Sequence, residues 1–198
     1  MKIIENLLSY KNPNGLAMII RHADRDKIPT GTFGNDVLLN EKGISNSLLL
    51  GEKLSNFSLA KIYTSPVKRC VQTAEFIMKG KNTPVEIIET SKLGDPGLHI
   101  TDENLAGTHF LQVGFHEIYR LFMKGQPVPG ITEAQIFKAE MDDFIKTHTH
   151  QNGITLFITH DALVAMYDFC LSGRVYTPEN WVEYLSGIII QTNHYGKE

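Results

Sequence analysis

Three short apolar runs in this chain each end where a basic or imidazole-bearing side chain follows. The runs are 16–20, 61–64 and 154–159. Each has the length and the β-branched or aromatic character of a buried strand, and each is followed by helix-like sequence. Strands that alternate with helices form a largely parallel sheet covered by helices on both faces. The sequence therefore predicts an α/β fold, a three-layer α/β/α sandwich, in which the three runs are strands.

The polar side chains that follow these runs are of kinds that bind anions. They are Arg21, His22 and Arg25 after the first run, Ser65 and Arg69 after the second, and His160 and Asp161 after the third. In an open α/β sheet, ligands bind outside the carboxyl ends of the strands. Guanidinium groups bind phosphate oxygens bidentately and stay charged. We therefore expect the three strand ends to form one pocket for a phosphate group.

Hydrophobic periodicity and turn signals predict the other elements. The expected elements are a polar lead-in at 1–15, strands at 16–21, 60–64, 85–89, 154–159 and 185–191, and helices at 66–79 and 161–172. A surface loop is expected at 24–40, and a helix opens at Asn40. The apolar stripe expected on that helix contains Ile44, Leu48, Leu49 and Leu54.

Between about 91 and 150 the alternation of strands and helices lapses. Two amphipathic helices are expected there, at 111–124 and 132–148, and a turn is expected at 94–97. We interpret this segment as a helical insertion near the pocket mouth, where substrate selectivity can reside. A length of 198 residues favours a single domain over 1–198 that includes the insertion.

The charge and hydropathy of the chain exclude some classes of partner. The formal net charge of -3 argues against a general nucleic-acid binder, although a pocket can be locally positive on a mildly acidic protein. No apolar run approaches the length of a membrane span, and residues 1–10 lack the pattern of a secretory signal. We therefore expect a cytoplasmic protein with no nucleic-acid or membrane partner, and the sequence does not indicate its oligomeric state. Cys70 and Cys170 are expected to be free core residues.

His22 has the sequence context of a nucleophile. A neutral imidazole can attack phosphorus and form a covalent phosphohistidine, which divides one difficult displacement into two easier steps. Neighbouring cations stabilise the transferred phosphoryl group and lower the pKa of the imidazole, which keeps it neutral. Asp161 can protonate the leaving oxygen. A helix N-terminus favours the ionised carboxylate, whereas a bound phosphate dianion raises its pKa, so we expect activity to favour mildly acidic pH.

Three motifs together resemble the histidine phosphatase superfamily, which includes phosphoglycerate mutases, phosphohistidine phosphatases and histidine acid phosphatases. The motifs are Arg21-His22-Ala23-Asp24-Arg25, Ser65-Pro66-x-x-Arg69 with Thr73-Ala74, and Thr159-His160-Asp161. The resemblance implies a phosphoglycerate mutase-like fold with His22 as the nucleophile. It also implies that Arg21, Arg69 and His160 hold the phosphate, with Arg25 as an auxiliary. We expect Arg25 and Ser65 to be substrate-binding residues.

The resemblance leaves the proton donor open between two branches of the family. In the acid phosphatase branch the donor is the aspartate after the second histidine, which is Asp161 here. In the mutase branch it is a glutamate in the middle of the chain, where this sequence offers Asp95, Asp102 and Glu103.

The expected function is hydrolysis of a phosphomonoester, on a small phosphorylated substrate or a phosphoprotein. Three alternatives remain: a phosphomutase, a phosphatase that acts on phosphohistidine in proteins, and a non-catalytic phospholigand-binding protein. No metal or organic cofactor is expected. The pair His148 and His150 lacks a third ligand, so solvated surface histidines are the better interpretation.

Overall fold

A five-stranded, mostly parallel sheet forms the centre of the computed structural model, which describes residues 1–192. The strands are β1 (Leu16–Arg21), β2 (Leu59–Thr64), β3 (Ile87–Glu89), β4 (Ile154–Thr159) and β5 (Gly187–Gln191). Their order across the sheet is β3-β2-β4-β1-β5, and only the edge strand β5 runs antiparallel to its neighbour. The predicted α/β fold with a mainly parallel sheet is confirmed.

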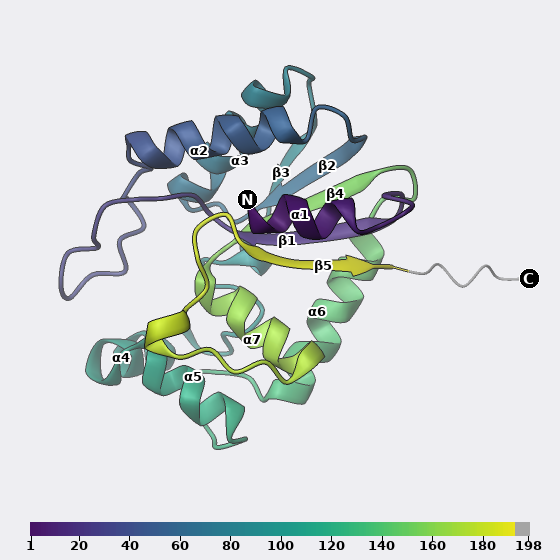
Figure 1. Ribbon diagram of the computed structural model, residues 1–198. Coiled ribbons are helices and arrows are strands. Elements are labelled where there is room, and N and C mark those ends of the chain that lie inside the picture. The colour runs from purple at the N-terminus through teal and green to yellow at the C-terminus, as the bar shows by residue number, and fades with distance from the viewer. Residues whose placement is uncertain (193–198) are drawn as a thin grey trace, which may run out of the picture.

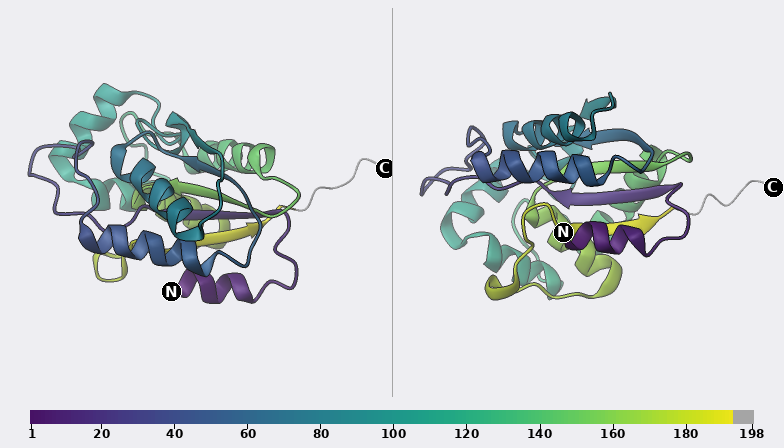
Figure 2. Two further views of the ribbon diagram at one scale, coloured as in Figure 1. Left: turned by 90° about the horizontal axis from the view of Figure 1, so that it is seen from above. Right: turned by 45° about the horizontal axis from the view of Figure 1, so that its top comes forward.

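Helices cover both faces of the sheet. They are α1 (Lys2–Leu8), α2 (Glu41–Lys53), α3 (Lys68–Lys81), α4 (Glu103–Val113), α5 (Phe115–Met123), α6 (Ala134–His148) and α7 (Asp161–Ser172), with short 3-10 turns η1 (Ser91–Leu93) and η2 (Pro178–Asn180). In Figure 1, α2 and α3 lie above the sheet and α6 and α7 lie below it. The two views of Figure 2 show the same layers, and α1 packs beside β5.

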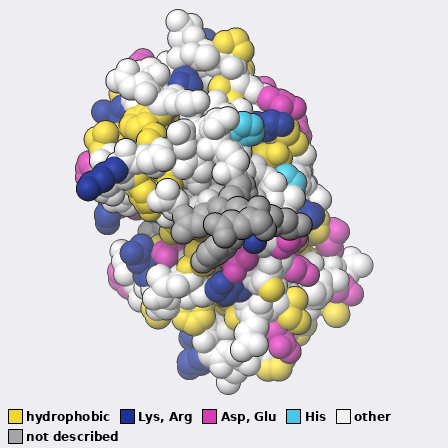
Figure 3. Space-filling model, turned by 90° about the vertical axis from the view of Figure 1, so that its right-hand side faces the viewer, with side chains coloured by type: hydrophobic (Ala, Val, Ile, Leu, Met, Phe, Trp, Pro, Cys, Tyr) yellow, Lys and Arg dark blue, Asp and Glu magenta, His cyan; other side chains and the backbone are white. Residues whose placement is uncertain are grey.

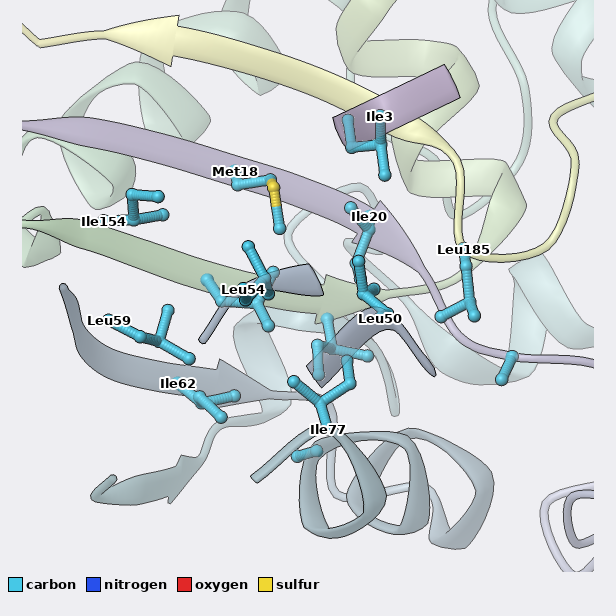
Figure 4. Close-up of a cluster of buried hydrophobic side chains, with 14 of the residues drawn as sticks. Ile3, Met18, Ile20, Leu50, Leu54, Leu59, Ile62, Ile77, Ile154 and Leu185 are labelled. Atoms are coloured by element: carbon cyan, nitrogen blue, oxygen red, sulfur yellow. The ribbon is translucent and has the colours of Figure 1, made fainter. Parts of the chain in front are cut away.

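The alternation of side chains along β1 divides the interior into two cores. Met18 and Ile20 point into the core beneath α2 and α3, whereas Ala17 and Ile19 point into the core beneath α5, α6 and α7. Figure 4 shows the first of these cores, in which side chains of α1, α2 and α3 meet those of β1, β2 and β4. All six residues of β1 and of β4 are buried, as expected for central strands of a parallel sheet.

Two glycines allow α2 and α3 to pack backbone against backbone. A Cβ atom on Gly51 would collide with the carbonyl oxygen of Ile77, and one on Gly80 would collide with that of Leu48. Gly51 and Gly80 lie near the C-terminal ends of α2 and α3, so this close contact sets the spacing of the two helices there.

Three predictions from the sequence were wrong in detail. The lead-in at 1–15 contains α1, whose Ile3, Ile4 and Leu7 enter the first core; seven residues are too few for a clear period. On α2, Leu49 is 41% exposed and Leu50 is buried, because the stripe follows the contact with α3. The insertion holds three helices, since Gly114, with φ of 77°, separates α4 from α5 within the expected 111–124 helix.

The face at which the parallel strands begin carries side chains of both charges. On the face shown in Figure 3, where the parallel strands begin, basic side chains are interspersed with acidic ones.

Within residues 1–192, no helix is both long and apolar enough to cross a membrane.

Candidate active site

The register of the sheet brings the three predicted strand ends together. Arg21 pairs with Thr159 across β1 and β4, and Thr64 pairs with Ile158 across β2 and β4. The residues that follow each strand, His22, Ser65 and His160, therefore emerge at one edge of the sheet. The rings of His22 and His160 meet edge to face, with their centroids 5.5 Å apart.

His22 is oriented as a neutral imidazole with Nε2 free of a proton. Its Nδ1 lies 2.8 Å from the carbonyl oxygen of Ala23, so Nδ1 carries the hydrogen that this contact requires. The Nε of Arg69 donates to His22 Nε2 at 3.0 Å, which uses the lone pair of that nitrogen. Burial lowers the pKa of His22 well below its usual value of 6.5, and the neighbouring His160 and the Arg69 guanidinium lower it further. His22 is only 2% exposed, and its ring is held in the neutral form.

Arg69 joins three parts of the site through its guanidinium. Besides its bond to His22, its Nη1 donates to the carbonyl oxygen of Gly34 at 2.7 Å. Its Nη2 lies 3.2 Å from His160 Nδ1. The second turn of α3 supports this position, because Thr73 Oγ1 donates to the Arg69 carbonyl and accepts from the amide of Ala23. Arg69 therefore spans the 24–40 loop and both histidines.

The contacts of His160 define which of its nitrogens carries hydrogen. Since Arg69 donates to Nδ1, the hydrogen lies on Nε2, which is 3.0 Å from Ser65 Oγ. The Ser65 hydroxyl in turn donates to the carbonyl oxygen of Gly94 at 3.3 Å. Burial and the Arg69 charge lower the pKa of His160 to about 3, so this ring is also neutral. Ser65 is fully buried behind His160 and contacts the ring rather than open space.

Arg21 is fixed from three sides. Its Nη1 donates to the carbonyl oxygen of Val182 at 2.5 Å, and its Nη2 pairs with Asp161 Oδ2 at 2.9 Å. The guanidinium carbon lies 3.9 Å from the centroid of the Tyr184 ring, a cation–π contact. Its Nε is buried without a partner. A buried donor of a cation without an acceptor is available to an anion that enters the site.

Asp161 opens α7 and is the carboxylate that pairs with Arg21. Burial raises the pKa of Asp161, but Arg21, the indole of Trp181 and His160 together lower it by more. The pKa of this carboxyl therefore lies below its usual value. Its Oδ1 accepts from the amide of Ala162 at 2.9 Å, and its side chain is 28% exposed. In the free protein this carboxyl is therefore ionised and reaches solvent.

The other sequence candidates lie at varying distances from the histidines. Arg25 is half-buried, donates to the carbonyl oxygen of Asp26, and its charge contributes to lowering the pKa of Arg69. Asp102 accepts from the amide of Leu105 as the N-cap of α4, so its oxygen has a structural partner. Asp95 accepts from Asn35 Nδ2 at 3.2 Å.

Two cavities flank the cluster. A smaller one of about 280 Å³ lies beside Arg69 and His160, and its lining includes Asp95 and Glu103. A wider groove of about 1160 Å³ runs along the other side of Arg21, between α1, α2 and the segment 174–187. Asp161 lies between the two, because its contact Trp181 lines the groove and its neighbour Ala162 lines the smaller cavity.

Sequence reasoning gave no role in the phosphate site to two residues that shape it. Gly94 lies against His160 and supplies the carbonyl that Ser65 binds, but the sequence shows it only as part of a turn. Tyr184 contacts Arg21 from a segment without regular structure, where no periodicity marks it. His148 lies elsewhere: its Nδ1 is 2.8 Å from the Phe144 carbonyl and its ring packs on Tyr63.

The fold is that of a phosphoglycerate mutase-like α/β protein, and two neutral histidines and two arginines gather at the ends of its parallel strands. Comparison with known proteins shows a family resemblance over part of the chain. The model for the histidine phosphatase superfamily (branch 1) matches residues 17–94, which confirms the resemblance predicted from the motifs. This segment contains Arg21, His22 and Arg69, whereas His160 and Asp161 lie outside it.

Individual proteins also resemble this chain. Phosphoserine phosphatase 1 of Hydrogenobacter thermophilus is 35% identical over 78 residues, which are 38% of this chain and 36% of that protein. The match thus spans little more than a third of the relative's length. A phosphoglycerate mutase from Bacillus anthracis superimposes with a TM-score of 0.58 at 19% identity, over 91% of this chain and 90% of that one. A mutant phosphoserine phosphatase from Entamoeba histolytica, solved with phosphoserine, gives a TM-score of 0.50 at 20% identity over 79% of each chain. Both structures show the same fold.

Proposed function

We propose that this chain is a phosphatase that hydrolyses a phosphomonoester through a covalent phosphohistidine on His22. The observation that carries the proposal is the environment of His22 Nε2: an unprotonated nitrogen, 3.0 Å from the Arg69 guanidinium, in a buried ring with a lowered pKa. The name of the Hydrogenobacter relative supports a phosphomonoester as the class of substrate.

In the first step, His22 Nε2 attacks phosphorus and the bond from phosphorus to the leaving oxygen breaks. The entering phosphate takes over the Arg69 Nε donor, which frees the Nε2 lone pair for attack. Arg21 and Arg69 approach from β1 and α3 and stabilise the charge on the phosphoryl oxygens, as preorganised donors do in phosphoryl transfer. His160 keeps Arg69 in place through Nδ1 and completes the ring of contacts around the phosphate.

Asp161 supplies the proton that the leaving oxygen needs. The bound phosphate shares the Arg21 charge that now holds the carboxylate, and this raises the pKa of Asp161 so that it takes a proton from solvent. In the second step water attacks phosphorus, its proton returns to Asp161, and the phosphorus–nitrogen bond breaks to restore neutral His22. The same group thus acts first as acid and then as base.

Ser65 and Arg25 support the site in different ways. Ser65 acts as a positioning residue, because its hydroxyl accepts from His160 Nε2 and contacts no open space. Arg25 adds positive charge beside Arg69 and is the auxiliary contact for the phosphate.

The first experiment measures release of phosphate from an aryl phosphate between pH 4 and 8 with a chelator present, for the wild type and for His22→Ala. The expected result is release that depends on His22, with a phosphoenzyme that is acid-labile when trapped by quenching. Phosphoenzyme that forms but is discharged onto a second phosphorylated substrate rather than water would identify a phosphomutase. Equal release by the two proteins would refute the proposal.

A second experiment tests the proton donor with matched variants. Asp161→Asn is expected to slow hydrolysis of an alkyl phosphate far more than that of an activated aryl phosphate, whose leaving group needs no proton. Asp95→Asn, which changes a carboxylate at the smaller cavity, is the control and is expected to affect both substrates alike. The reverse pattern would move the donor role to Asp95.

A further inference from the structure

The cavity beside Arg69 and His160 has a wall that is mainly apolar. Its principal apolar side chains are Phe33, Ile100, Phe110, Phe115, Ile118 and Ile131. They come from the 24–40 loop and from the insertion, and the rings of Phe33 and Phe110 face each other with centroids 5.5 Å apart. Phe33 is 48% exposed, as is common for an aromatic residue at the mouth of a binding site rather than in a core.

The polar groups in this cavity repel negative charge. Asp95 and Glu103 are its two carboxylates. Among the described lining residues, Arg69 is the only arginine or lysine, and its guanidinium already contacts both histidines. His99 adds no positive charge, because burial lowers its pKa to about 4. A second phosphate or a carboxylate placed here would face two like charges without a free cation.

We propose that this cavity receives the leaving group, and that the substrates are monoesters of aromatic or aliphatic alcohols that carry no further negative charge. The inference rests on the phosphatase function proposed above, because it assigns the cavity to the part of the ester beyond the bridging oxygen. A volume of about 280 Å³ equals that of roughly nine water molecules at about 30 Å³ each, which fits one or two rings or a short alkyl chain. Burial of such a group against the phenylalanines favours binding, whereas a terminal carboxylate must lose water beside Asp95 and Glu103.

The test compares two phosphonates that differ at one end only, hexylphosphonate and 6-phosphonohexanoate. Neither is hydrolysed, so calorimetry on the wild-type protein reports binding alone. We expect hexylphosphonate to bind at least about tenfold more tightly, which corresponds to about 1.4 kcal/mol. Equal binding, tighter binding of the carboxylate, or no binding of either compound would overturn the inference.

Variants separate the two causes of this preference. The double variant Asp95→Asn/Glu103→Gln removes both negative charges. It is expected to bind 6-phosphonohexanoate more tightly and hexylphosphonate as before, so that the ratio of the two affinities falls to about twofold. Phe110→Ala is expected to weaken hexylphosphonate about tenfold through lost apolar contact. Leu111→Ala, at the next position of α4 and 51% exposed outside the cavity, is the control and is expected to leave both affinities unchanged.

Hydrolysis of hexyl phosphate distinguishes failure of this inference from failure of the proposed function. Preferential binding of hexylphosphonate without hydrolysis of any monoester would refute the phosphatase proposal and keep the apolar ligand site. Hydrolysis that is equally fast for hexyl phosphate and for its ω-carboxylate would keep the phosphatase and refute the substrate class.

Discussion

Gly94→Ala tests whether the position of His160 controls catalysis. Gly94 has φ of 137° and ψ of 149°, a region that is essentially restricted to glycine. A Cβ atom at this position would lie 2.6 Å from His160 Nε2 and 3.0 Å from Ser65 Oγ. The substitution therefore pushes directly on the imidazole and on the hydroxyl that orients it.

The size of the effect follows from these distances. An ordinary contact between such atoms is about 3.5 Å, so the His160 ring must move by roughly 1 Å. A shift of about 1 Å in a catalytic site can cost about 100-fold in rate, and we expect kcat/KM to fall by that factor. The strained backbone is expected to lower the free energy of unfolding by about 1–3 kcal/mol in addition.

The assay is kcat/KM for an aryl phosphate together with urea unfolding. Gly125→Ala is the matched control, since Gly125 also has a positive φ of 64° but nothing lies within 4 Å of its added Cβ. It is expected to lose about 1–2 kcal/mol of stability and no activity. Ser65→Ala removes the hydroxyl that contacts the His160 ring, without straining the backbone, and is expected to lower kcat/KM about tenfold. This variant tests the same reasoning if Gly94→Ala does not fold. Folded Gly94→Ala with wild-type kcat/KM would refute the reasoning.

Three further predictions concern the nucleophile, pH and a buried lysine. His22→Ala is expected to lower kcat by more than about 10³-fold while the protein still folds; substantial residual turnover argues against this nucleophile. The pKa of His99 is about 4 in the folded protein, whereas it is about 6.5 in the unfolded chain. Between these two pH values the unfolded chain binds more protons than the folded protein, so the free energy of unfolding falls as the pH falls through that window. His99→Gln is expected to flatten the slope of unfolding free energy against pH there by up to about 1.4 kcal/mol per unit, and an unchanged slope contradicts the assignment. Lys81 Nζ donates to the carbonyl oxygens of Leu54 and Phe57, so Lys81→Met is expected to cost about 1.5–3 kcal/mol in urea unfolding while kcat is retained. Loss of activity in folded Lys81→Met would show that this contact also reaches the site.

The strands and the edge of the sheet that carries the site are determined by local sequence. A central strand of a parallel sheet is buried on both faces and therefore consists of a short apolar run, so β1 and β4 are visible at 16–21 and 154–159. Because the carboxyl ends of parallel strands share one edge, the convergence of His22, Ser65 and His160 follows from the order of the chain alone.

The chemical state of the site was decided by tertiary contacts. The proton position on His160 depends on Arg69 and Ser65, which lie 91 and 95 residues away in the chain. Pairing of Arg21 with Asp161 likewise joins two strand ends, and it sets the charge of a carboxyl that the sequence shows as a candidate proton donor but without its partner. Such contacts depend on distances between elements, and no periodic pattern along the chain records them.

The same physical reason explains the parts of the fold that the sequence did not show. The short helix α1 acquires its stability by burying Ile3 and Leu7 against β1 and β5, since seven residues have little helical preference in isolation. Leu50 rather than Leu49 is buried because α3 packs closely against α2. The apolar cavity forms where the 24–40 loop meets the insertion. Local sequence determines which segments become strands and which residues stand at their ends, whereas protonation, ion pairing and cavity shape arise from groups that meet only in the folded chain.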